Sequence, residues 1–272
     1  MPGDQAVARE ARLVKQVVRW LRTQGIESSI HGWPDRNRGA WDERLTVEAV
    51  LTLGTTPCQR DWALDVMMVP VPQAVVRSIM TAREQILPQA AALAGQAGVA
   101  VTVSVRFVRE AKERKAYYEQ VLHLVQAALA SGDDYFDESG NDPATHVILE
   151  PGEFISGPDG PTGAVRVHLM FGTSTTGDLL AELGETLAGP LGKKLTNQLQ
   201  RAKDLGYPTM LALDQVGHEA LPGGTAWLPS AHAVATVVTE LCEAHPGVLD
   251  AALLATHTGE LVQVFGTTSP AS

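Results

Sequence analysis

The stretch Asp61-Trp62-Ala63-Leu64-Asp65-Val66-Met67-Met68-Val69 has the composition of a buried strand. It is apolar and contains aromatic and β-branched residues, and proline stands on both sides of it, at Pro57 and Pro70. Successive side chains of a strand point to opposite faces of the sheet. One face is therefore wholly apolar, and we expect it to pack into a core: Trp62, Leu64, Val66 and Met68.

The other face of the same stretch carries two carboxylates, Asp61 and Asp65, beside Ala63 and Met67. Carboxylates on an otherwise buried strand are costly unless water, a cation or a metal ion compensates them. This strand is consequently the first place to look for a functional site.

A second apolar stretch, 45–53, precedes this strand and carries Glu48 in its middle. The alternation predicts a strand with Glu48 on its polar face. The short turn at 54–59 favours an antiparallel hairpin between the two strands, because consecutive strands usually pair. We therefore expect Glu48 to lie near Asp61 or Asp65, on the same face as Asp65.

Hydrophobic periodicity predicts alternating helices and strands along the rest of the chain. Helices are expected at 6–25, at 72–98 with an interruption near Pro88, at 110–131, at 178–206 with a break at Gly189-Pro190, and at 230–244. Further strands are expected at 28–33, 99–108, 145–150, 163–172, 207–216, 249–255 and 260–265. No internal repeat and no long linker is present, so we expect one mixed α/β domain over 1–272, with a central mixed sheet flanked by helices.

Composition and charge narrow the classes of function. The 272 residues are 44% hydrophobic, and the net charge is −10, which disfavours nucleic-acid binding through the overall field. No run of about 18 apolar residues is present, and the start lacks the order of a signal peptide, so we expect no membrane contact and a cytoplasmic location. Cys58 and Cys242 favour two unpaired, buried thiols over a disulfide.

One basic concentration interrupts this acidic chain, in the helix expected at 178–206. Its cations are Lys193, Lys194, Arg201 and Lys203. If nucleic acid is a partner, we expect it to bind there. The alternative, which helix composition favours, is an ordinary solvated face.

The order of elements resembles the restriction-endonuclease-like fold of the PD-(D/E)xK nucleases. That order is a helix, a strand, a strand with Glu48, a strand with Asp65, and then helices and further strands. Three stretches carry the resemblance: Asp61 to Asp65, the helix Lys193 to Leu199, and the apolar strand Thr209 to Asp214. The closest similarity is to uncharacterised bacterial proteins of that general look. The resemblance implies a restriction-endonuclease-like core with inserted strands and helices.

The same resemblance implies a site for Mg²⁺ or Mn²⁺. Glu48 and Asp65 would match the two strand acids, and Glu10 on the first helix would be a further ligand. The metal would polarise a phosphate and lower the pKa of a bound water. The usual lysine, two residues after the second acid, is replaced by Met67, so Lys193 or Lys194 would have to supply that cation from the later helix.

These residues leave three alternatives open. The first is a metal-dependent nuclease that acts on phosphodiester bonds, with Glu48, Asp65, Lys193 and Lys194 as catalytic residues. The second is a non-catalytic binding or regulatory protein on the same fold with a degenerate site, which Met67 and the acidic charge favour, and whose partner is nucleic acid or another protein. The third is a solvent-facing position for Glu48 and Asp65 without function.

Overall fold

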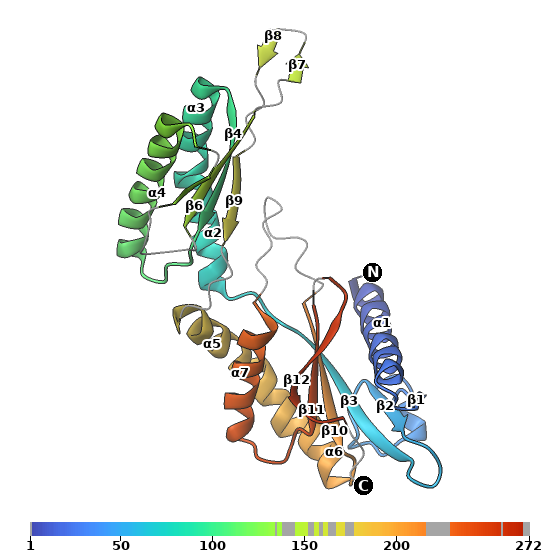
Figure 1. Cartoon of the computed structure of the whole chain (residues 1–272). Helices are drawn as coiled ribbons and strands as arrows, with labels where there is room; N and C mark the ends of the chain where they lie inside the picture. The colour runs from blue at the N-terminus through green and yellow to red at the C-terminus, as the bar shows by residue number, and fades with distance from the viewer. Residues whose placement is uncertain are drawn as a thin grey trace. The chain divides into compact units, whose positions relative to one another are not determined.

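The strand expected at 61–69 is β3, Arg60–Met68, and it lies inside a six-stranded sheet (Figure 1). The computed structural model describes residues 2–133, 135–137, 145–151, 155–157, 160–162, 167–171, 177–215, 229–256 and 258–268. Contacts divide the chain into two units: unit 1 comprises Met1–Pro70, Leu183–Gly217 and Leu228–Ser272, and unit 2 comprises Val71–Glu182 and His218–Trp227. The chain is mixed α/β, as expected, and the single domain over 1–272 stays a prediction.

The sheet of unit 1 is mixed, as the sequence predicts. Its strands are β1 (Ser28–Gly32), β2 (Ala49–Leu53), β3, β10 (Thr209–Asp214), β11 (Ala251–Ala255) and β12 (Leu261–Gly266), in that spatial order. β1, β2 and β3 pair antiparallel, β3, β10 and β11 are parallel, and β12 returns antiparallel. The expected hairpin partners β2 and β3 and the closing pair β11 and β12 are confirmed.

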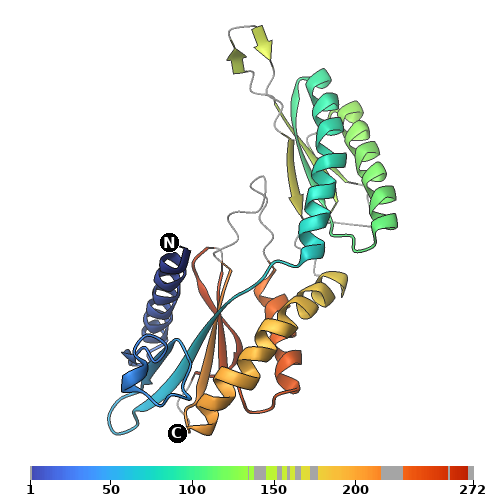
Figure 2. The same ribbon diagram turned by 180° about the vertical axis from the view of Figure 1, so that it is seen from behind.

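Helices cover both faces of this sheet (Figures 1 and 2). Helix α1, Pro2–Thr23, packs the apolar stripe around Val14, Val17 and Leu21 against one face, which includes Trp62 and Leu64. The other face carries Ala63 and Asp65 and is covered by the unit 1 part of α5 (Gly177–Lys193), from Leu183 onward, by the π-helical segment η2 (Lys194–Leu199), and by α6 (Gln200–Asp204) and α7 (Ala231–Glu243). β10 is buried along its whole length, as its unbroken apolar sequence predicts.

Two predictions about β2 and β3 are wrong in detail. Met68 was expected in the core but is 49% exposed, because it is the last residue of β3. β2 begins at Ala49, so Glu48 lies just before the strand and not in its middle. β2 begins this late because its backbone pairing starts only there. Its first partner on β1 is Gly32, and its first partner on β3 is Leu64.

The helix expected at 178–206 does not break at Gly189-Pro190. Helix α5 runs through Pro190, and the irregularity comes later, as the π-helical turns of η2. Wide π turns rotate the following side chains relative to an α-helix and are frequent at functional sites. Here the segment begins at Lys194.

Unit 2 has its own sheet, in the order β5 (Tyr135–Asp137), β6 (His146–Pro151), β4 (Val99–Val105) and β9 (Val167–Phe171). A two-stranded sheet pairs β7 (Ile155–Gly157) with β8 (Gly160–Thr162). Helices α2 (Gln73–Gln85), α3 (Leu87–Ala97) and α4 (Ala111–Ser131) pack on a core that includes Val103, Tyr118 and Val147. The expected interruption near Pro88 is the junction of α2 and α3.

Two further observations complete the fold. No helix of the described ranges is long and apolar enough to cross a membrane. Cys58 and Cys242 are both free, and Cys242 is buried as expected. Cys58 is exposed, contrary to expectation, because it lies in the turn between β2 and β3. The same turn requires glycine at position 54, where φ is 92° and a Cβ would lie 2.9 Å from the Cys58 carbonyl oxygen.

Candidate functional site

Asp65 is a buried, ion-paired carboxylate in the middle of the sheet. Its residue is 1% exposed, and the Nζ of Lys194 lies 2.9 Å from each of its two oxygens. The backbone N–H of Val66 donates a further bond of 2.9 Å to Oδ1. Burial raises the pKa of Asp65, while the Lys194 ammonium opposes this rise. The alternative of a solvent-facing Asp65 is therefore wrong.

The helical segment above the sheet explains why Lys194 reaches Asp65 and Lys193 does not. Leu191, Leu195 and Leu199 are fully buried and mark the side of the segment that faces the sheet. Lys194 lies beside this stripe with its side chain 20% exposed, whereas Lys193 is exposed. Of the two lysines named from the sequence, the structure brings Lys194 to the strand acid.

Glu48 lies at the edge of the same site. The last residue pair of the β2–β3 ladder is Ala49 and Leu64, so Glu48 continues the register toward Asp65. Burial is the main cause that raises the pKa of Glu48 to about 7, and the like charges of Glu10, Asp65 and Asp35 add to it. Lys194 acts in the opposite direction. Glu48 is thus half-buried among carboxylates.

Glu10 and Asp35 complete this acidic group from outside the sheet. Glu10 is half-buried on α1, and Asp35 is exposed in the turn after β1. The Nη2 of Arg36 donates to the carbonyl oxygen of Val7 at 3.1 Å and ties that turn to α1. The charges of Glu10, Asp35, Asp65 and Lys194 all act on Glu48, although Glu10 belongs to the helix on the other face of the sheet, and a common site of these residues stays a prediction.

The donor set does not fit a divalent metal ion. In the described part of the chain, no three His, Cys, Asp or Glu residues converge closely enough to hold one. Of the about four lone-pair positions on the Asp65 oxygens, the Lys194 ammonium takes one on each oxygen and the Val66 N–H takes another, so little of this carboxylate is left for a metal ion. Mg²⁺ and Mn²⁺ require several free oxygen ligands at about 2.0–2.2 Å.

The position of the missing lysine is also filled differently. Met67 is 6% exposed and shares the face of Asp65. A side chain buried there packs in the core and contacts no solvent-borne substrate. Met67 therefore serves packing, and among the described contacts Lys194 is the only cation bonded to Asp65.

The basic helix offers less free charge than its sequence indicates. Lys203 donates to Asp250 Oδ1 at 2.7 Å, and Lys194 is committed to Asp65. Lys193 and Arg201 are exposed. Two of the four cations expected to bind nucleic acid are thus paired with carboxylates inside unit 1.

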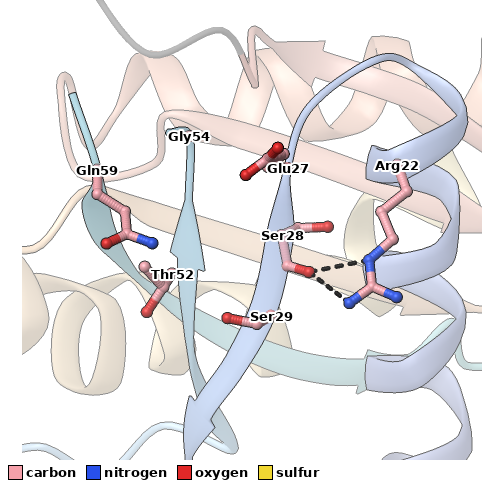
Figure 3. Close-up of a pocket in the computed structure, with 7 residues that line it drawn as sticks. All are labelled: Arg22, Glu27, Ser28, Ser29, Thr52, Gly54 and Gln59. Atoms are coloured by element: carbon pink, nitrogen blue, oxygen red, sulfur yellow. Dashed lines mark hydrogen bonds between the residues drawn. The ribbon is translucent and has the colours of Figure 1, made fainter. Parts of the chain in front are cut away.

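Asp61, the other carboxylate of β3, has a separate set of partners. Thr52 Oγ1 donates to Asp61 Oδ1 at 2.6 Å, and the Nδ1 of His31 lies 2.8 Å from Oδ2. The same strands form a polar hollow of about 290 Å³ at the far end of β2 from Glu48 (Figure 3). Arg22 at its wall donates two bonds to the Ser28 carbonyl oxygen, of 3.0 and 2.7 Å, so that cation holds α1 to β1.

Sequence reasoning missed one charged pair, Arg9 and Asp214. The Nε of Arg9 on α1 donates to Asp214 Oδ2 at 2.6 Å, at the end of β10. One feature of the sequence pointed to such a pair: an aspartate ends a strand that is buried on both faces, and a carboxylate there needs a cation. Its partner stands 205 residues away, and the sequence does not identify it.

Comparison of the chain with protein families, with curated proteins and with solved structures gave no significant match.

Proposed function

We propose that this chain is a non-catalytic binding protein whose acidic centre is a structural ion pair. The observation that supports this most directly is the contact of the Lys194 ammonium with both oxygens of Asp65, at 2.9 Å each. In a metal-dependent nuclease, those oxygens would bind the ion that polarises the phosphate. Here they are taken by a lysine of the same chain.

Three further features support the same proposal. Met67 occupies the usual lysine position and is buried. Glu48 has a pKa near 7, so its carboxylate is partly protonated at neutral pH and is a weaker metal ligand. The net charge of −10 disfavours the approach of a polyanionic substrate. We retain the restriction-endonuclease-like core as the scaffold in this proposal. Its basis is the order of the elements: a helix, three antiparallel strands, a helix and a parallel strand.

A metal titration combined with a cleavage assay tests the proposal. Calorimetry with Mn²⁺ is expected to give no saturable binding, and plasmid and single-stranded DNA are expected to stay intact in Mn²⁺. Asp65→Ala and Glu48→Ala serve as matched controls. Saturable Mn²⁺ binding and cleavage in the wild type that both variants lose would overturn the proposal in favour of the nuclease.

A further inference from the structure

A cavity of about 440 Å³ lies in unit 1 between α1 and the carboxyl ends of two parallel strands. Val66 and Met68 of β3 give it apolar walls, and its charged walls come from Arg9, Arg12, Glu10 and Asp214. Met68 and Asp214 are the last residues of β3 and β10 and face each other in the ladder. The volume is typical of small-molecule sites, which run from roughly 300 to 1,000 Å³. The carboxyl ends of parallel strands are where open α/β sheets usually bind ligands.

The guanidinium of Arg9 has one donor group to spare in this cavity wall. Its Nε donates to Asp214 at 2.6 Å, and its Nη1 contacts the sulfur of Met68 at 3.2 Å. Its Nη2 is buried and has no hydrogen-bond partner among the described residues. An unpaired buried donor on a charged group is unfavourable, so a small turn of the guanidinium that brings Nη2 to an acceptor in the cavity gains a hydrogen bond.

The remaining charges of the wall select the acceptor. Asp214 is neutralised by the Nε of Arg9, and Arg12 stands three residues along the same side of α1, exposed. Guanidinium groups favour carboxylate and phosphate oxygens as partners. Glu10 on the same wall repels additional negative charge, which disfavours polyanions such as nucleic acid.

An apolar surface lies next to these donors. Met68 is 49% exposed although it ends a core strand, and Val66 beside it is only partly covered by α1. A ligand with an apolar body would bury this surface, which water otherwise covers.

We infer that the cavity binds a small molecule that carries one carboxylate or phosphate group on an apolar body. The oxyanion accepts from the exposed Arg12 and, after that turn of the guanidinium, from Arg9 Nη2, and the apolar body lies against Val66 and Met68. This inference rests on the proposed binding function, for which it names the class of ligand.

Three test ligands with the same ring separate the contributions: benzoate, phenyl phosphate and neutral benzyl alcohol. Two-dimensional NMR of the full chain is expected to show saturable shifts at the backbone amides of Arg9, Val66 and Met68 with an anionic ligand. Binding of phenyl phosphate alone assigns the site to phosphates, and binding of both anions assigns it to oxyanions in general. Benzyl alcohol is expected to bind at least about tenfold more weakly.

Three variants test the residues. Arg9→Lys keeps a cation for Asp214 but removes the guanidinium that carries Nη2, and Arg12→Gln removes an exposed cation. Each is expected to weaken anion binding by about tenfold. Arg19→Gln, which removes an exposed cation two turns further along α1, is the control and is expected to leave binding unchanged.

The inference is overturned if neither anion shifts these amides up to its solubility limit. It is equally overturned if benzyl alcohol binds as well as the anions, or if Arg9→Lys and Arg12→Gln bind like the wild type. Mn²⁺-dependent DNA cleavage would overturn the proposed function without altering any of these binding curves, so the two failures are distinguishable.

Discussion

Removing the cation from Asp65 tests the ion pair on which the functional argument depends. In Lys194→Met, the Asp65 carboxylate keeps the N–H bond from Val66 but loses the ammonium that contacts both of its oxygens. Breaking a buried ion pair from one side typically costs about 3–5 kcal/mol. The Lys194 side chain is 20% exposed and Asp65 is able to take up a proton, so we expect the low end, about 3 kcal/mol at pH 7.5.

The pH dependence of that cost identifies its cause. Without Lys194, the pKa of Asp65 rises further above its value in the unfolded chain. An acid whose pKa is raised on folding contributes stability below its unfolded pKa, and this contribution is lost as pH rises through the folded pKa. The cost of Lys194→Met should therefore be smallest near pH 4 and grow as pH rises through the raised pKa of Asp65.

Urea unfolding followed by tryptophan fluorescence measures these free energies in unit 1, which contains Trp20, Trp33, Trp41 and Trp62. Lys193→Met makes the same substitution one residue earlier, at an exposed position, and is expected to stay within about 0.5 kcal/mol of the wild type. The double variant Asp65→Asn with Lys194→Met removes both charges and is expected to recover most of the lost stability. If Lys194→Met is as harmless as Lys193→Met, or if the double variant is no more stable than the single one, the reasoning is refuted.

Three further predictions follow from the same site. Folding raises the pKa of Glu48 from 4.5 to about 7, so its contribution to stability is present below pH 4.5 and lost as pH rises to 7; Glu48→Gln should flatten the fall in unfolding free energy across this window, and an unchanged slope in urea titrations would contradict the cause. Met67→Lys should lower the free energy of unfolding by several kcal/mol, about 3–5, and create no DNA cleavage, because the position is 6% exposed; a stable or cleaving variant in thermal melts and plasmid assays argues against this packing. Any DNA binding at the basic helix should give a slope of log K against log salt no steeper than about −2, since only Lys193 and Arg201 are exposed and unused; a steeper slope in fluorescence anisotropy places the contact elsewhere.

The fold of unit 1 could be predicted where local pattern and burial agree. The apolar stripe of α1 follows from burial of one side of the helix, and the unbroken apolar sequence of β10 follows from burial of both faces of the strand. Both patterns are visible in the sequence. The start of β2 could not be predicted, because residues 45–48 have the alternation of a strand but no partner strand beside them. The sequence also did not show that α5 continues through Pro190 and that the irregularity falls later, in η2. The position of these π turns depends on packing against the sheet.

The site was predicted in its membership more than in its chemistry. Asp65 and Lys194 were named from the resemblance and are in direct contact, whereas Glu10 and Glu48 are linked to them only through the charges that act on Glu48. The choice between Lys193 and Lys194 depends on the buried stripe through Leu191, Leu195 and Leu199, whose phase is fixed only once the helix lies on the sheet. The Arg9–Asp214 pair was missed because α1 and β10 are neighbours in space and not in sequence.

The identity of the cation bound to Asp65 decides between the nuclease and the binding protein. A divalent ion at Asp65 would have to share its two oxygens with the Lys194 ammonium and the Val66 N–H, and the positive charge of Lys194 would oppose its binding. The ammonium belongs to the chain and is held there by the buried leucines of its own helix, whereas a metal ion must be taken from solution and must leave a mostly buried lysine unpaired. Glu48 does not reverse this competition, because a carboxyl with a pKa near 7 must first lose its proton to bind a metal. We therefore propose that the acidic cluster is structural in the folded chain, with Asp65 paired to Lys194 and Glu48 partly protonated at neutral pH.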